Sequence, residues 1–249
     1  MQTQDGIVSP ENGSIRHVGA NRGVEWISSA FTMFTKKPGE FIVAGLLLFV
    51  ATFILNFIPV VGTGLATMLG VVAVGAFMFA CKAVDEGQDP IAAAQKAFNV
   101  TPLFILGLIA AGMGIAVGLL GSALLVMAVG MAFVNPFLGA ALGALSGLLM
   151  MLISVPMVMA LWLAPGLVVM KGTQPIEAIR LSFVASLKNF VPFIIFYLLA
   201  AVATFVGGLV IVGVIVVFPI LLIATYMAYK DIFGMTAGGD GVSLIKDAP

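Results

Sequence analysis

Charged residues are scarce in this sequence. They make up 9% of its 249 residues, whereas 61% are hydrophobic and the mean hydropathy is +1.20. An ordinary soluble domain carries about 25% charged residues, so this composition excludes that class and predicts an integral membrane protein. The formal net charge is zero, and nucleic acid is not expected among the partners.

Reactive side chains are also few. The sequence has one cysteine, Cys81, and one histidine, His17, so an internal disulfide is excluded. It contains no Cys-x-x-Cys, Gly-x-Ser-x-Gly or phosphate-loop motif. We therefore expect no enzyme activity, no cofactor, and no catalytic or metal-binding residue. The alternative is a membrane enzyme with a site at the cytoplasmic mouth formed by Asp85, Glu86 and Asp89, which we interpret as a solvated turn.

Three long tracts lack charge altogether. They cover residues 41–81, 97–170 and 189–229, and each is far longer than the roughly 20 residues that cross the hydrocarbon core as a helix. Each tract is therefore predicted to hold two crossings joined by a turn. Turn-forming residues lie within each tract, at Asn56 to Pro59, Asn135-Pro136 and Gly207-Gly208. Continuous apolar runs favour helices over barrel strands, so the predicted fold class is an all-α polytopic membrane protein with six transmembrane helices.

The basic residues predict the orientation of these helices. They all lie in the two tails or between the tracts: Arg16, Arg22, Lys36, Lys37, Lys82, Lys96, Lys171, Arg180, Lys188, Lys230 and Lys246. With six crossings these regions share one side of the membrane, and the positive-inside rule makes that side the cytoplasm. We expect a six-helix domain over residues 23–234, a flexible cytoplasmic tail over residues 1–22, and another cytoplasmic tail over residues 235–249.

The sequence also repeats itself. A shift of 152 positions, from Glu25 to Glu177, brings identical residues into register without a gap. The matched residues in the first copy are Glu25, Ile27, Phe31, Lys36, Phe41, Ile42, Leu46, Leu47, Val50, Ala51, Thr52 and Phe53. Residues 90–98 parallel residues 175–183 and mark a further copy. We predict three hairpin repeats, over residues 24–85, 90–171 and 175–233.

Each repeat is predicted to begin with a short amphipathic helix. Apolar residues recur at helical spacing ahead of the first and third hairpins, at Trp26, Ile27, Phe31 and Phe34 and at Ile176, Ile179, Phe183 and Leu187. Such stripes are typical of helices that lie flat at the membrane interface. The alternative is that the stripes pack against the helix bundle.

Charged and aromatic residues near the cytoplasmic ends are the candidate contacts to the membrane interface and lipid headgroups. They are Arg22, Trp26, Lys36, Lys37, Arg180, Lys188, Tyr226, Tyr229, Lys230 and Asp231. Within this set, Lys230 and Asp231 are expected to form an ion pair at the end of the last helix. Anchoring to lipid is the first interpretation, and a specific lipid or protein site is the alternative.

Glycines and prolines distinguish the third and fourth helices. Glycine recurs every four residues, a spacing that lets helix backbones approach closely. The candidate packing positions are Gly114, Gly118, Gly139, Gly143 and Gly147. We interpret them as packing within one bundle, with a homodimer seam as the alternative. Pro156 and Pro165 are predicted to bend the fourth helix.

Short motifs carry a resemblance to a known family. Arg-Gly-Val-Glu-Trp-Ile at residues 22–27 leads to Phe-Thr-Met-Phe at 31–34, and Tyr-Lys-Asp-Ile-Phe at 229–233 closes the last helix. Residues 22–234 resemble the uncharacterised six-helix bacterial inner-membrane proteins of the YciC-like kind, a domain of unknown function. Lys230 stands where that family would have Arg, so a bidentate contact is not carried over. The resemblance implies a multi-pass protein of the bacterial cytoplasmic membrane and supplies no catalytic residues.

The predicted interior carries no ionisable side chain. Ionisable groups at membrane depth usually accompany transport or catalysis, so their absence from the apolar tracts favours a non-enzymatic scaffold or lipid-organising component. Membrane lipids are the expected partners, with a second copy of the chain or another membrane protein. The alternative function is a carrier or flippase for a neutral or amphiphilic solute, in which the repeats act as rocking elements.

Overall fold

The computed structural model describes residues 15–59, 61–209 and 211–234, and within these ranges the regular elements are all helices. Six of them are long and apolar enough to cross a membrane: Pro38–Leu55 (α2), Val61–Asp85 (α3), Thr101–Val134 (α5), Pro136–Lys171 (α6 with α7), Phe190–Leu209 (α9) and Ile215–Phe233 (most of α10). The prediction of an all-helical chain with six helices of membrane-spanning length is confirmed for the described residues.

A shorter helix precedes each pair of long helices in the chain. These shorter helices are α1 (Arg22–Phe34), α4 (Pro90–Gln95) with the 3-10 helix η1 (Lys96–Asn99), and α8 (Pro175–Lys188). The fourth long helix is divided into α6 (Pro136–Trp162) and α7 (Ala164–Lys171), and the last helix, α10, runs over Ile211–Phe233. Proline begins α4 and α8 at the first helical position, where its missing N–H removes no helical hydrogen bond.

Two of the three predicted turns lie between long helices, at residues 56–59 after α2 and at Asn135 after α5, whereas Gly207 and Gly208 lie within α9, which continues to Leu209. Asn135 separates α5 from α6, and its Oδ1 accepts hydrogen bonds from the backbone N–H groups of Phe137 and Leu138 at 3.0 and 3.2 Å. This cap satisfies donors that a helix start leaves free. At the α9–α10 turn a Cβ on Gly213 would lie 2.7 Å from the Cα of Gly207, so glycine is required for the two backbones to come this close.

The packed core lies toward the charged end of the helices. Within it, the Trp162 ring of α6 has its centroid 5.8 Å from that of Trp26, 5.1 Å from that of Phe193 and 5.2 Å from that of Phe196. These contacts join α1, α6 and α9, and α1 also packs on α10. Aromatic pairs at such distances add to the stabilisation from burial, so the short helix α1 is part of the core.

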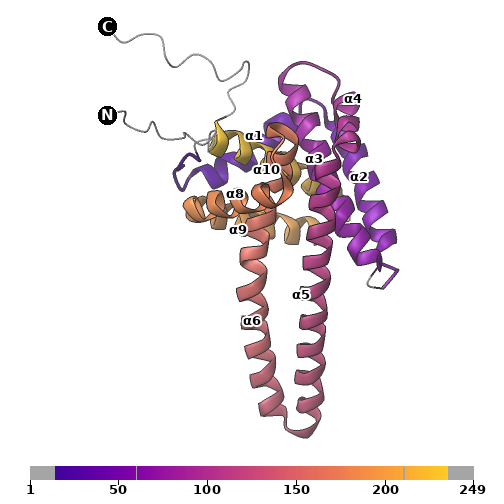
Figure 1. Cartoon of the computed structure of the whole chain (residues 1–249), viewed down its shortest axis with the longest axis vertical. Helices are drawn as coiled ribbons and strands as arrows, with labels where there is room; N and C mark the ends of the chain where they lie inside the picture. The colour runs from indigo at the N-terminus through magenta and orange to yellow at the C-terminus, as the bar shows by residue number, and fades with distance from the viewer. Residues whose placement is uncertain (1–14, 60, 210, 235–249) are drawn as a thin grey trace, which may run out of the picture.

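The α5–α6 pair extends well beyond the other helices (Figure 1). At about 1.5 Å per residue, the 34 residues of α5 span about 51 Å, against about 30 Å for the hydrocarbon core of a bilayer. Side chains near the tip have few protein neighbours, and Phe133 is 88% exposed. Within the described residues, this end of the pair is therefore covered mainly by its own two helices.

The predicted glycine positions on this pair divide into three groups. A Cβ on Gly139 would lie 2.4 Å from the Cα of Ala132, so Gly139 permits close packing of α6 on α5. A Cβ on Gly114 would lie 3.8 Å from its nearest neighbour and a Cβ on Gly143 would lie 4.0 Å from its own, and both distances are ordinary van der Waals contacts. A Cβ on Gly118 or on Gly147 would meet no described atom within 4 Å. Close packing within the bundle is thus found at one of the five positions.

The fourth long helix breaks at Leu163, two residues before Pro165. Ser182 of α8 fills the break: its Oγ accepts from the N–H of Leu163 at 3.0 Å and donates to the carbonyl oxygen of Met159 at 2.8 Å. Ser186 Oγ donates to the same oxygen at 3.1 Å. A hydroxyl inserted into the helical ladder is a recognised cause of a kink. The predicted bend at Pro165 is confirmed, whereas α6 continues through Pro156.

We predict that Ser182→Ala lowers the free energy of unfolding by about 1–3 kcal/mol, because it leaves the buried N–H of Leu163 without an acceptor. The measurement is an SDS titration of the purified protein in mild detergent. Ser122→Ala is the matched control, since the exposed Ser122 hydroxyl donates only to the Leu119 carbonyl of its own helix, and its effect should stay within about 0.5 kcal/mol. Equal effects of the two variants would contradict this assignment.

Candidate functional site

Most of the polar side chains that meet from different helices form one group at the charged end. We call it the polar cluster, and it consists of Arg22, Glu25 and Trp26 of α1, Asp85 of α3, and Tyr226, Lys230 and Asp231 of α10. Helical spacing explains why α10 serves two partners. Tyr226 and Lys230 are four residues apart and share one face, while Asp231 is turned about 100° from Lys230.

Asp231 connects α10 to α1. Its Oδ2 accepts from Arg22 Nε at 2.6 Å and from Trp26 Nε1 at 3.0 Å, and Arg22 also pairs with Glu25 one turn along α1. The hydrogen bond to Asp231 raises the pKa of the Arg22 guanidinium, with added contributions from the charges of Asp231 and Glu25 and an opposing one from partial burial. Arg22 therefore remains charged across the physiological pH range.

Asp85 connects α10 to α3. Its Oδ2 accepts from Lys230 Nζ at 2.6 Å and from the Tyr226 hydroxyl at 3.0 Å. Both charged side chains are largely shielded from solvent, at 22% and 17% exposed for Lys230 and Asp85. A carboxylate that accepts two such bonds joins two helices more firmly than an exposed surface pair would.

The expected ion pair between Lys230 and Asp231 is wrong. Each residue pairs with a different helix instead, Lys230 with Asp85 and Asp231 with Arg22. Adjacent residues on a helix do not face each other, so Lys230 and Asp231 form their ion pairs with residues of other helices.

The aromatic members of the predicted interface set are also corrected. Trp26 and Tyr226 are 2% exposed and Tyr229 is fully buried, so these three rings contact protein rather than lipid headgroups. The apolar stripe of α1 packs in part against the bundle, which was the alternative interpretation. The Tyr229 hydroxyl has no hydrogen-bond partner among the described residues.

The other predicted interface residues lie on the surface, and their contact with lipid stays a prediction. Arg180 forms two hydrogen bonds with Glu177, at 2.9 and 2.7 Å, and Lys37 pairs with Glu40 at 3.3 Å. Lys36 is exposed, and Lys188 donates to the carbonyl oxygen of Ile15 at 2.7 Å.

The segment before α1 is held in place by hydrogen bonds. Asn189, between α8 and α9, accepts from the N–H of Val18 at 2.8 Å and donates to the carbonyl oxygen of Arg16 at 3.0 Å. The N–H of Arg16 donates to the Ile232 carbonyl at 2.9 Å. Residues 16 and 18 are thus tied to the ends of α8 and α10, while the flexibility of the tail over residues 1–22 stays a prediction, and residues 1–14 and the tail over 235–249 lie outside the described residues.

The three neighbouring acids of the 85–89 segment do not form a common site. Asp85 belongs to the polar cluster, Glu86 pairs with Lys82 at 3.8 Å, and Asp89 Oδ1 accepts from the N–H of Ile91 at the start of α4. In the described part of the chain, no group of three His, Cys, Asp or Glu side chains is arranged to hold a metal ion. Each acid thus has a separate local role.

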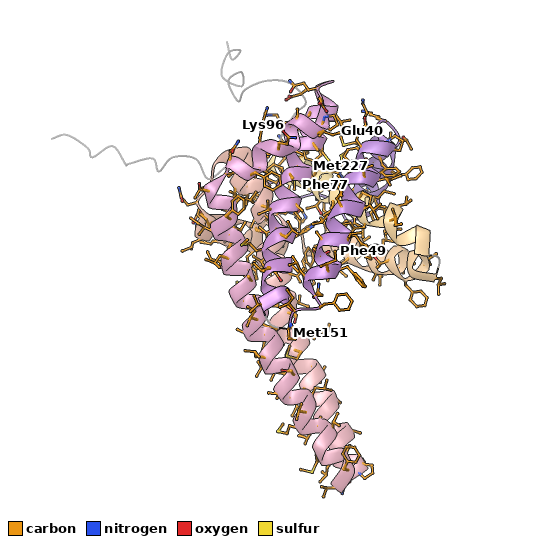
Figure 2. The ribbon with its side chains drawn as sticks, turned by 90° about the vertical axis from the view of Figure 1, so that its right-hand side faces the viewer. Glu40, Phe49, Phe77, Lys96, Met151 and Met227 are labelled. Atoms are coloured by element: carbon orange, nitrogen blue, oxygen red, sulfur yellow. The ribbon has the colours of Figure 1, made fainter. Side chains whose placement is uncertain are left out.

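An apolar groove lies on the outer side of α2 and α3 below α4. We call it the α2–α3 groove; its volume is about 300 Å³, and Glu40 lies at its polar end. Figure 2 shows Glu40 at the charged end of α2 and Phe49 farther along the same helix. Alanines create the hollow between larger apolar side chains. They are Ala44, Ala73, Ala76, Ala80 and Ala94, among Phe41, Leu47, Leu48, Leu69, Val72, Phe77, Pro90, Ile91 and Phe98.

Sequence reasoning missed this groove. Its alanines recur at helical spacing on one face of α3, which is a weak signal because alanine is common in every membrane helix. A second cavity, of about 250 Å³, lies beside the polar cluster and is lined by residues that include Arg16, Arg22 and Lys230. Its two acidic lining residues, Glu25 and Asp231, are both paired with Arg22.

Comparison of the chain with protein families, curated proteins and solved structures finds no match. The resemblance to the YciC-like proteins therefore stays a prediction, and the site must be interpreted from its own geometry.

We predict opposite effects for two phenylalanine substitutions on α10. Tyr226→Phe removes a hydrogen bond to a carboxylate and should lower the free energy of unfolding by about 1.5–3 kcal/mol, whereas Tyr229→Phe removes a buried hydroxyl without a partner and should leave it unchanged or raise it by about 1 kcal/mol. SDS titration in detergent compares the variants. A loss at Tyr229 as large as that at Tyr226 would show that the Tyr229 hydroxyl has a bonding partner.

Proposed function

We propose that this protein is a non-enzymatic, multi-pass protein of the bacterial inner membrane that binds and organises membrane lipid. The observation that carries the proposal is the α2–α3 groove, which is apolar along its length and has a charged residue at one end only. Pockets of about 300–1,000 Å³ accommodate small ligands, and a groove on the outer side of membrane helices is open to lipid.

The packed centre supports lipid organisation over the carrier alternative. Trp26, Trp162 and Phe196 occupy the space where α1, α6 and α9 meet, and a carrier requires a pathway through such a region. The groove borders the core at Phe41, Val72 and Phe77. Neither tryptophan nor Phe196 lines it, so lipid can occupy it without separating α1, α6 and α9. Membership of the YciC-like family, which the motifs of residues 22–34 and 229–233 suggest, is part of the same proposal.

We further propose that the chain consists of three repeats, each an interfacial helix followed by a transmembrane pair. The order of elements supports this, because α1, α4 with η1, and α8 each precede two long helices. On α8 the small residues Ala178, Ser182 and Ala185 are buried while Ile176 is 76% exposed. An exposed apolar side chain beside the Glu177–Arg180 pair suits a helix at the membrane interface.

The proposed orientation places both chain ends and all basic segments in the cytoplasm. An amine-reactive reagent that cannot cross membranes should label the exposed Lys36 and Lys96 in inside-out vesicles but not in right-side-out vesicles, as measured by peptide mass spectrometry. This follows from the segregation of Lys and Arg to one side of the six helices. Labelling of either lysine in right-side-out vesicles would contradict the orientation.

Filling the groove should release the lipid. We predict that the wild-type protein, purified in mild detergent, carries a stoichiometric lipid in native mass spectrometry and that Ala44→Phe loses most of it, because the larger ring occupies the hollow. Val43→Phe is the matched control: Val43 is the neighbouring residue on α2, is exposed, and does not line the groove.

Two results would reject lipid binding by the groove. The first is a wild-type protein without stoichiometric lipid, and the second is equal lipid retention by Ala44→Phe and Val43→Phe. Circular dichroism of both variants establishes that each retains its helices.

A further inference from the structure

We infer that the α2–α3 groove selects a phospholipid whose headgroup carries a primary ammonium beside its phosphate, with the ammonium at Glu40 and the phosphate at Lys37. This inference rests on the proposed function, because it names the lipid class for the same groove. It is carried by three observations: the depth of the groove, its small volume, and the charges at its mouth, which is the end at Glu40.

The groove has the depth of one leaflet. On α2 it runs from Glu40 to Leu48, and on α3 from Ala80 to Leu69, which at about 1.5 Å per residue gives about 12 and 16 Å. Half of the hydrocarbon core is about 15 Å. An acyl chain that starts at the headgroup level therefore lies along the groove and ends near the bilayer midplane.

The volume limits the occupant to a chain. A transmembrane helix with its side chains is about 10 Å across, which is too wide for a groove of about 300 Å³ that is formed by the absence of side-chain atoms at four alanines on α2 and α3. Phe41 and Phe77, whose ring centroids lie 6.1 Å apart, line its upper part. A flexible hydrocarbon chain follows such a narrow path, whereas a second copy of the protein does not enter it.

The charges at the mouth favour an ammonium group. Glu40 is the charged residue that lines the groove, and Asp89 at the start of α4 is close enough to add to the negative potential there. Lys37 Nζ lies 3.3 Å from Glu40 Oε1, and its side chain is half exposed. A carboxylate beside a lysine is complementary to a headgroup that carries ammonium and phosphate next to each other.

This arrangement also discriminates between headgroups. A primary ammonium donates hydrogen bonds to the Glu40 carboxylate, whereas a trimethylammonium has no N–H to donate. A headgroup with phosphate and no amine offers no cation to Glu40 and brings its negative phosphate close to the Glu40 carboxylate. The groove should therefore prefer phosphatidylethanolamine over phosphatidylcholine and phosphatidylglycerol.

The test uses the full chain reconstituted into nanodiscs that contain the three lipids in equal amounts, followed by detergent extraction and quantification of the retained lipid by mass spectrometry. Phosphatidylethanolamine should be enriched about fivefold, which corresponds to about 1 kcal/mol. Glu40→Gln should abolish the enrichment, measured as the ratio of retained phosphatidylethanolamine to each of the other two lipids. Glu177→Gln is the control, since it breaks a comparable surface pair on α8, away from the groove.

The outcomes separate the two proposals. Retained lipid without headgroup preference, preference for either other lipid, or an enrichment that survives Glu40→Gln would overturn the headgroup inference and leave the proposed function intact. Absence of retained lipid from the wild-type protein would overturn both. Circular dichroism of Glu40→Gln and Glu177→Gln establishes that both variants retain their helices.

Discussion

Hydrocarbon does not solvate charge, and this constraint determines where the helices of the protein can be tied together. Asp85, Lys230, Arg22 and Asp231 meet at one end of the long helices, where water and headgroups can stabilise whatever charge the pairs leave uncompensated. Ionic contacts there fix α1, α3 and α10 relative to one another. At the opposite ends of the described helices, close backbone approach takes their place, as at Gly139 and at Gly207 with Gly213.

The features that could be predicted from the sequence are those with a local cause. Six helices follow from apolar tracts long enough for two crossings each, and the turns follow from residues such as Asn135 that cap a helix start. The position of the break near Pro165 has the same character, because a proline removes a hydrogen bond from its own helix, whereas the Ser182 hydroxyl that fills the break comes from α8. Each of these depends on a few adjacent residues, so sequence order alone contains the information.

Features that depend on distant partners could not be predicted. The pairing of Lys230 with Asp85 joins residues 145 positions apart, and the sequence offered the adjacent Asp231 as a simpler partner. Trp26 is of a residue type common at the membrane interface, yet it is buried in the core. An amphipathic stripe in the sequence does not reveal whether lipid or protein covers it. The groove depends on how α2, α3 and α4 are spaced. The sequence predicts that Lys37 contacts headgroups, but its pairing with Glu40, which the inferred headgroup site depends on, is seen only in the structure.

The length of the α5–α6 pair has a consequence for the surrounding bilayer. A helix of about 51 Å inclined by 40°, the upper end of the observed range, still projects about 39 Å along the membrane normal. Inclination alone therefore leaves about 9 Å of apolar surface beyond a 30 Å hydrocarbon layer. The bilayer must therefore either thicken around the pair or leave its ends in the headgroup layer, at a cost that is smaller in a thicker membrane. Because this cost depends on local bilayer thickness, the protein should partition toward thicker regions of the membrane.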